Sequence, residues 1–282
     1  MNFLATSPEI QYPKGKNNMK TQIKLILFAG IGLIPAAVMA ATIYTQDFES
    51  FNLGDVTGQG TFTANTNYDV IDSGLGYANG AVNVPGGDQS MQITDFISNS
   101  SFATTFTSQS DTVYFALTLK YDGYDSGEFY QFGITNSSNT DNIAGIRMGG
   151  NNAINLRSKG ASQSDTGSFA YTDGQTARLV MSISKDASTN YNTLKLWYNP
   201  TSLTEGAPDG TLVNDIGIAS VDRIYGRMGG SSANFESTDR LTFDNIIVGN
   251  SYADVVVIPE PGTLALLGIA LGGLLLFHRR KG

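Results

Sequence analysis

The fold is decided by one stretch of the chain, Val113-Tyr114-Phe115-Ala116-Leu117-Thr118-Leu119-Lys120. Large apolar side chains occupy every second position, and this period of two predicts a β-strand with one face in a core. Similar alternation recurs in residues 130–134, 144–148, 154–156, 179–183, 194–198 and 241–248. Turn residues (Gly, Asn, Asp and Ser) separate these segments. Helical periodicity is hard to find, so the sequence predicts an all-β protein.

The spacing of these segments also predicts how they are arranged. The stretch at residues 113–120 and the next three segments follow one another closely. We expect these four to form a meander with Gly149-Gly150-Asn151-Asn152 as one hairpin turn. A chain of this length with many strands and little helix predicts one domain, a two-sheet antiparallel sandwich of the jelly-roll type.

One short motif, Arg-Met-Gly-Gly, occurs twice, at Arg147 to Gly150 and at Arg227 to Gly230. Two interpretations are open. The copies are equivalent turns related by pseudo-symmetry that frame the rim of a binding face, or they are a coincidence between hairpins in a chain with 32 glycines.

The N-terminal residues have the pattern of an export signal. Two lysines precede an apolar stretch from Leu25 to Val38, and Ala40 ends a signal peptidase site. We expect residues 1–40 to be a signal peptide cleaved after Ala40, with Met19 as the true start. An uncleaved transmembrane anchor is the alternative, although a proline and small residues near the end of the stretch favour cleavage.

The C-terminal residues have three parts: Pro259-Glu260-Pro261, an apolar run from Leu264 to Phe277, and Arg279-Arg280-Lys281. The run is short for a membrane span, but flanking arginines can snorkel, and we expect a single C-terminal transmembrane helix. Basic residues beside such a helix stay on the cytoplasmic side, so the rest of the chain faces outward.

This tripartite tail resembles the PEP-CTERM sorting signal of exopolysaccharide-producing Gram-negative bacteria. The resemblance implies that residues 255–282 are a sorting signal. It also implies a partner, exosortase, an integral-membrane cysteine transpeptidase-like protease that cuts near the motif and releases or transfers the ectodomain. The prolines remove backbone donors and favour an extended segment, which suits a processing site. The alternative is an ordinary tail anchor that is never processed.

The composition limits the chemistry of the domain between the two signals. Residues 42–258 contain 23 Asp or Glu and 10 Lys or Arg, a net charge of −13. Such a domain repels phosphate, so we expect no nucleic-acid partner, and cations or neutral glycans are favoured instead. Cysteine is absent and the only histidine, His278, lies in the tail. Cys-His and Ser-His-Asp catalysis, His or Cys zinc sites and disulfides are therefore excluded, whereas carboxylate pairs and calcium sites are not.

A second resemblance covers most of the domain. Residues 171–255 are similar to bacterial concanavalin A-like (laminin G-like) jelly rolls. The similar segments are Ala177-Arg178-Leu179-Val180, Leu194-Lys195-Leu196-Trp197-Tyr198-Asn199-Pro200 and Phe243-Asp244-Asn245-Ile246-Ile247-Val248-Gly249-Asn250. Asp47-Phe48-Glu49-Ser50-Phe51 is also similar to their first strand. The resemblance implies a jelly-roll domain over residues 41–254 that binds glycans.

Candidate ligand residues follow from the alternation. Trp197 lies on the strand face opposite Leu194 and Leu196, and we expect it to act as a sugar platform with Tyr114 and Tyr225. The alternative is that this second face is also buried.

Carboxylates suggest two oxygen sites. Asp122, Asp125 and Glu128 lie within seven residues of a Gly-containing loop and are a candidate calcium site. Their spacing is not that of an EF-hand, and a solvated hairpin tip is the alternative. The resemblance to jelly rolls implies that the first and last strands meet, and there a second oxygen cluster is expected from Glu49, Asp55, Asp244 and Asn245.

For catalysis we expect no residues, because no strand carries the Glu-x-Asp-x-Glu spacing of jelly-roll glucanases. The sequence thus predicts a non-enzymatic secreted or cell-surface protein of the exopolysaccharide matrix that binds glycans. The alternatives are a polysaccharide-degrading hydrolase or lyase and a structural matrix or adhesion protein without glycan binding.

Overall fold

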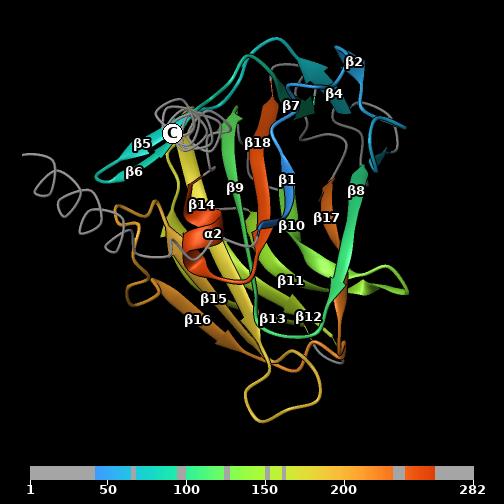
Figure 1. Ribbon diagram of the computed structural model, residues 1–282, viewed down its shortest axis with the longest axis vertical. Coiled ribbons are helices and arrows are strands. Elements are labelled where there is room, and N and C mark those ends of the chain that lie inside the picture. The colour runs from blue at the N-terminus through green and yellow to red at the C-terminus, as the bar shows by residue number, and fades with distance from the viewer. Residues whose placement is uncertain are drawn as a thin grey trace, which may run out of the picture. The chain divides into compact units, whose positions relative to one another are not determined.

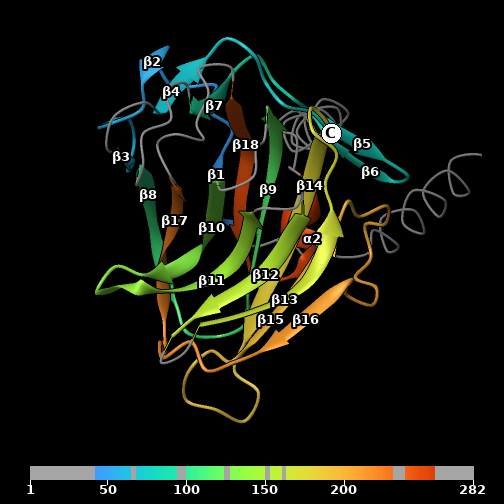
Figure 2. The same ribbon diagram turned by 180° about the vertical axis from the view of Figure 1, so that it is seen from behind.

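The computed structural model describes residues 42–64, 68–93, 100–123, 128–149, 153–160, 163–230 and 239–257. These residues form antiparallel strands and one short helix, arranged as a sandwich of two main sheets (Figures 1 and 2). The expected signal peptide and transmembrane helix lie outside the described residues. None of the helical residues in the described ranges forms a helix with the length and hydropathy needed to span a membrane.

The larger sheet has nine strands, with β18 near its centre. Eight of them run in the order β16 (Gly210–Val213), β15 (Thr193–Tyr198), β14 (Thr176–Ser184), β9 (Val113–Asp122), β18 (Arg240–Gly249), β7 (Ser90–Ile93), β4 (Tyr68–Ile71) and β2 (Gly54–Asp55). The ninth, β1 (Thr42–Gln46), pairs with the second half of β18. The first and last strands of the domain are therefore neighbours, as the resemblance to jelly rolls implies.

The smaller sheet has seven strands. Their order is β13 (Gln163–Ala170), β12 (Ala153–Lys159), β11 (Asn139–Gly149), β10 (Glu128–Asn136), β17 (Val221–Gly230), β8 (Ser101–Gln109) and β3 (Thr63–Ala64). A separate hairpin consists of β5 (Tyr77–Asn79) and β6 (Val82–Val84).

Three expectations about these segments need correction. The meander runs through β10, β11, β12 and β13, whereas β9 belongs to the other sheet, between β14 and β18. The first strand ends at Gln46, and the chain then turns at Phe48, which has a φ of 63° and accepts a hydrogen bond from the N–H of Phe51. Finally, the described parts of both Arg-Met-Gly-Gly copies are strand rather than turn.

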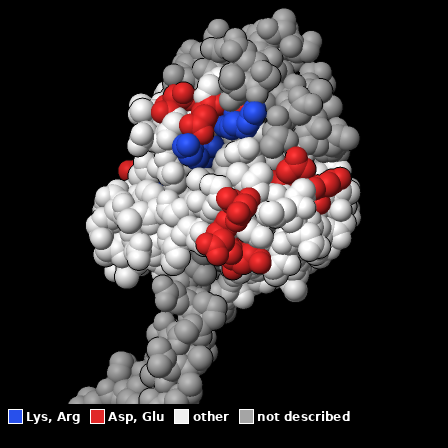
Figure 3. Space-filling model, turned by 90° about the horizontal axis from the view of Figure 1, so that it is seen from above, with Lys and Arg blue, Asp and Glu red and all other residues white. Residues whose placement is uncertain are grey.

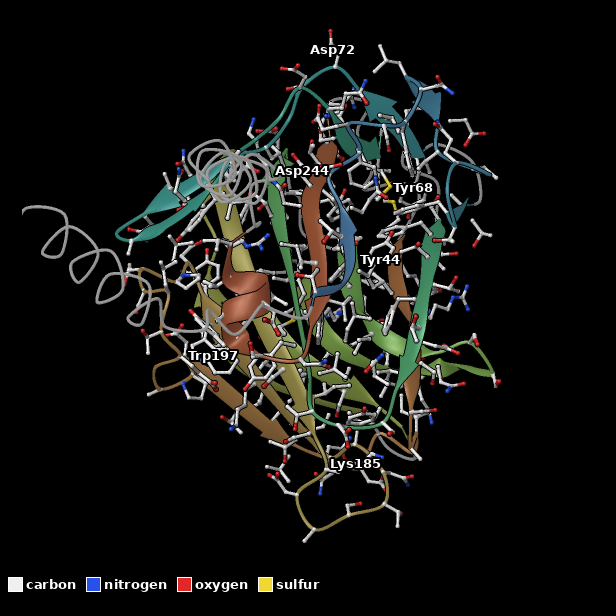
Figure 4. The ribbon with its side chains drawn as sticks, in the orientation of Figure 1. Tyr44, Tyr68, Asp72, Lys185, Trp197 and Asp244 are labelled. Atoms are coloured by element: carbon white, nitrogen blue, oxygen red, sulfur yellow. The ribbon has the colours of Figure 1, made fainter. Side chains whose placement is uncertain are left out.

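The main core lies between the two sheets, where the period of two predicts it. Phe115 and Leu117 of β9 face Phe132 and other buried apolar side chains of the smaller sheet. Phe102 of β8 lies among several aromatic rings, with centroid distances of 5.3 Å to Tyr68 and 5.8 Å to Phe243. Tyr44 joins the sheets, since its hydroxyl is 3.0 Å from Thr104 Oγ1 of β8. Figure 4 shows Tyr44 and Tyr68 in this interior.

A second apolar cluster covers the opposite face of the larger sheet. It contains Tyr77, Val82 and Val84 of the β5–β6 hairpin and residues of helix α2 (Tyr252–Val256). The helix begins at Ser251, whose side chain accepts a hydrogen bond from the N–H of Asp254 while the carboxylate of Asp254 accepts one from Ser251, a capping box. The outer face of the larger sheet is therefore a core and not a free surface.

Arg178 of β14 fastens α2 to this sheet. Its side chain has no exposed surface. Nη1 donates to Thr118 Oγ1 (3.2 Å) and to the carbonyl of Asn245 (2.8 Å), and Nη2 donates to the carbonyl of Val255 in α2 (2.6 Å). One buried cation thus joins two strands of the sheet and the helix that covers them.

Candidate functional site

The expected sugar platform, Trp197, is on the covered face of the larger sheet. Its side chain is 4% exposed, and its Nε1 donates to the carbonyl of Gly206 at 3.0 Å. The ring packs edge-on against Tyr252 of α2 at 5.2 Å and stacks on Tyr114 at 6.1 Å (Figure 4). The sequence correctly places Trp197 opposite Leu194 and Leu196, but the burial argues against an open platform.

The other two expected platform residues do not lie together. Tyr114 of β9 is on the same face as Trp197, and its hydroxyl donates to Glu205 Oε2 at 3.0 Å. Burial and this carboxylate raise the pKa of Tyr114 to about 12. Tyr225 belongs to β17 in the other sheet. The three aromatic residues therefore cannot form one binding surface.

The outer face of the smaller sheet is different, because no described element packs over it. Side chains alternate along β10, so that Tyr130, Phe132 and Ile134 enter the core and Phe129 and Gln131 point outward. Figure 2 shows β11 and β12 of this sheet in the foreground. This face is the candidate binding face.

The two Arg-Met-Gly-Gly copies meet at this face. Strands β11 and β17 flank β10, and Arg147 and Arg227 both pair with Gln131, one from each side. Their guanidinium carbons lie 5.1 Å and 5.3 Å from the centroid of the same ring, Phe129. The copies therefore occupy matching positions on either side of β10, but they are strands of one sheet and not turns related by the pseudo-symmetry of two stacked sheets.

Several hydrogen-bond donors at this place lack an acceptor. Gln131 is 5% exposed, and its Nε2 has no partner. The Nε atoms of Arg147 and Arg227 are also buried without a partner. Buried donors normally have acceptors, so three unpaired donors in one row of the sheet make this row a candidate site.

Further residues extend the face along the strands. Arg223 lies over the ring of Tyr225 at 5.6 Å, two positions before it on β17. Arg157 of β12 is ion-paired with Asp165 of β13, with Nε 2.6 Å from Oδ1. Seen from above, acidic groups occupy several places on the surface and the basic groups lie beside some of them (Figure 3).

The two expected calcium ligands that the structure describes, Asp122 and Glu128, each have another partner. Asp122 ends β9 and forms an ion pair with Lys120 at 2.9 Å. Glu128 begins β10 in the other sheet, is buried, and accepts a hydrogen bond from the hydroxyl of Tyr121 at 2.7 Å. Asp125 lies outside the described residues. The described ranges contain no group of three or more acidic or histidine side chains placed to hold a metal ion.

The second expected oxygen cluster is a hydrogen-bonded core site. Asp244 accepts from the backbone N–H of Leu75 at 2.8 Å, and the amide of Asn245 donates to the carbonyl of Leu75 at 2.9 Å. Burial raises the pKa of Asp244 to about 8, with a smaller contribution from the nearby charge of Glu49. These side chains fix the loop before β5 to β18, where Figure 4 labels Asp244. Asp55 instead accepts from the N–H of Thr57.

Sequence reasoning did not select Phe129, Gln131 or Arg223. The duplicated motif is the feature of the sequence that could have indicated these residues, because its two arginines pair with the same neighbouring strand. Without the register, the strand between the two copies could not be named.

The C-terminal residues of this chain match a known family of sorting motifs. The fold is an antiparallel β-sandwich domain followed by a C-terminal sorting segment, and residues 257–281 match the PEP-CTERM protein-sorting motif. The chain therefore carries a PEP-CTERM motif, which marks an exported protein handled by exosortase. The search of curated proteins found no match.

Solved structures with similar architecture are distant. They include a sialidase (11% identity, 75% of this chain and 18% of that one, TM-score 0.48). Another is the binding domain of botulinum neurotoxin serotype G (11% identity, 76% and 50%, TM-score 0.47). A third is the endo-β-1,4-glucuronan lyase of Trichoderma reesei (12% identity, 76% and 98%, TM-score 0.43). This chain spans half or less of the first two, and we infer no activity from any of these likenesses.

Proposed function

We propose that this protein is delivered to the cell surface or the extracellular polysaccharide matrix, where its sandwich binds glycans without catalysis. Signal peptidase removes the N-terminal signal after Ala40, and exosortase cuts near Pro259-Glu260-Pro261. The observation that carries this proposal is the sorting motif at residues 257–281, placed directly after a folded all-β domain.

Glycan binding is assigned to the outer face of the smaller sheet. The corresponding face of the larger sheet is filled by α2 and the β5–β6 hairpin. This face, over which no described element packs, offers the rings of Phe129 and Tyr225 and the unpaired donors of Gln131 and two arginines. Aromatic surfaces with convergent polar groups are the usual composition of a ligand site.

The partners of the carboxylates support a non-catalytic role. Glu49 accepts from the backbone N–H groups of Asp88 and Gln89 at 2.9 Å each, which fixes it in a turn. Glu205 accepts from Tyr114, and Glu128 accepts from Tyr121 beneath the surface. Each of these glutamates serves the fold, whereas glycoside hydrolysis needs a pair of carboxyl groups facing one bond.

The sorting part is tested in the host with and without exosortase. We expect a product trimmed near Ala40 and Pro259 and found outside the cell only when exosortase is present. A protein that keeps its tail in the membrane in both strains contradicts this part of the proposal.

The binding part is tested with the purified protein on immobilised polysaccharides, including the exopolysaccharide of the host. Retention that competes with the soluble glycan supports it, and absence of retention on every polysaccharide overturns it. New reducing ends in the same incubation would instead identify a polysaccharide-degrading enzyme.

A further inference from the structure

We propose that Arg147 and Arg227 form a clamp for the carboxylate groups of an acidic polysaccharide, a polyuronate chain. The inference rests on the proposed function, since it names the class of glycan that the outer face of the smaller sheet binds. It concerns the residues around Phe129, on which both guanidinium groups lie.

Both arginines are cations, and the Nε–H group of each lacks a hydrogen-bond acceptor. Residues 42–258 have 23 acidic and only 10 basic side chains, so most cations could be paired. In the described part of the chain, Lys120 is paired with Asp122 and Arg157 with Asp165. Arg147 and Arg227 have no carboxylate partner there, and the Nε of each is buried without an acceptor. Each guanidinium rests on the ring of Phe129 with its charge unneutralised by a described carboxylate, so an anionic group of a ligand would supply the missing partner.

The geometry favours a planar anion. Arginine presents a rigid fork that matches a carboxylate bidentately, and contact with an aromatic ring holds the fork in place. The ring of Phe129 does this for both groups. Gly149 supplies the space, because a Cβ at this position would lie 2.8 Å from Nη1 of Arg147.

The surroundings favour a carboxylate that is part of a sugar. Gln131 lies between the two arginines and offers the unpaired donor Nε2. In the same row, Arg147 pairs with Asn155 of β12, and Arg227 pairs with Ser101 of β8. Polar groups spaced across several strands suit the hydroxyls of successive sugar rings.

The acidity of the domain does not prevent this binding. The net charge of −13 for residues 42–258 repels a polyanion at long range. At physiological ionic strength the Debye length is about 8 Å, so distant carboxylates are screened while groups in contact are not. The arginines therefore decide the interaction at close range.

The test is equilibrium binding of the full-length protein in detergent to oligosaccharides of polygalacturonate. The same oligosaccharides after reduction of their carboxyl groups are the neutral comparison, and dextran sulfate is a second anion. We expect Arg147→Gln and Arg227→Gln each to weaken binding of the polyuronate about tenfold or more, the size of one lost charge-assisted contact. Lys195→Gln on the larger sheet removes the same charge and is expected to change binding less than about twofold.

Two further variants separate geometry from charge. Gly149→Ala keeps every charge but displaces the guanidinium of Arg147, and we expect it to weaken binding nearly as much as Arg147→Gln. The double variant Arg147→Lys with Arg227→Lys keeps the charge but loses the fork, and we expect it to bind more weakly than the wild type. Fluorescence of Trp197 confirms that each variant is folded.

Each outcome has one meaning. Equal binding of charged and reduced oligosaccharides, unaffected by the arginine variants, overturns the clamp and leaves glycan binding intact. Dextran sulfate bound as tightly as the polyuronate overturns the carboxylate assignment. Failure to bind any oligosaccharide, together with no retention on the host exopolysaccharide, overturns the clamp and the proposed function alike.

Discussion

Replacing Arg178 by methionine tests whether one buried cation holds α2 on the larger sheet. The guanidinium donates to the hydroxyl of Thr118 and to the carbonyls of Asn245 and Val255. Methionine is flexible and fills much of the space, but it has no donor, so both buried carbonyls lose this partner.

The magnitude follows from two opposing contributions. Hydrogen bonds from a charged donor contribute about 1.5–3 kcal/mol each, so three contribute roughly 4–9 kcal/mol. Burial lowers the pKa of Arg178 from 12.5 to about 9. At about 1.4 kcal/mol per pKa unit, keeping the group charged costs about 5 kcal/mol, which the methionine variant escapes. We therefore expect Arg178→Met to lower the free energy of unfolding by about 2 kcal/mol.

The assay uses Trp197, the only tryptophan of the chain, which contacts Tyr252 of α2. We expect a lower midpoint in urea and a red-shifted emission before global unfolding, because the released helix exposes the indole. Lys195→Met, which removes a cation from the same sheet, is the control and should leave both unchanged. A free energy of unfolding for Arg178→Met within about 0.5 kcal/mol of the wild type, with unchanged emission, would refute the reasoning.

Three further predictions concern other buried groups. The pKa of Asp244 is raised from 3.8 to about 8, so the fold favours its protonated form. The stability of the wild type relative to Asp244→Asn should therefore fall as pH rises from 5 to 8, by roughly 1 kcal/mol per pH unit, and urea titrations showing a constant difference contradict this. Trp197→Phe should cost about 1–3 kcal/mol through the lost bond to Gly206 and a small cavity, while retention on glycans stays unchanged. Tyr171→Phe should cost about 1–3 kcal/mol in thermal or urea unfolding, since its hydroxyl accepts from the N–H of Tyr121 at 2.6 Å; an unchanged midpoint contradicts this role.

The sequence predicts the strands well, because the alternation of apolar and polar residues within each strand shows which side chains enter the core. Residues 113–120, 130–134 and 194–198 all fall in strands whose apolar positions enter the core. It does not predict which sheet a strand joins. The partners of β9 are β14 and β18, each more than fifty residues away, and nothing in residues 113–120 distinguishes these pairings from a local one with β10. The expected four-strand meander is wrong for this reason.

The neighbours of each candidate functional residue also come from distant parts of the chain. The alternation within its own strand determines which sheet face Trp197 lies on. The residues that bury it belong to other parts of the chain, 77–84 and 252–256. The duplicated arginines show the opposite case. Their motif is visible in the sequence, but its meaning depends on β10 lying between the two copies. Sequence patterns fix which way a side chain points, whereas the neighbours it meets depend on strand order.

The position of α2 separates the two tasks proposed for this domain. The helix ends at Val256, and the matched sorting motif begins at residue 257, so the sorting segment leaves the domain from the covered face of the larger sheet. The candidate binding face belongs to the other sheet and points away from the shared core. The start of the sorting motif and the arginines on Phe129 therefore lie on different sheets. The proposed processing of the tail and the proposed binding at the arginines thus involve separate parts of the sandwich.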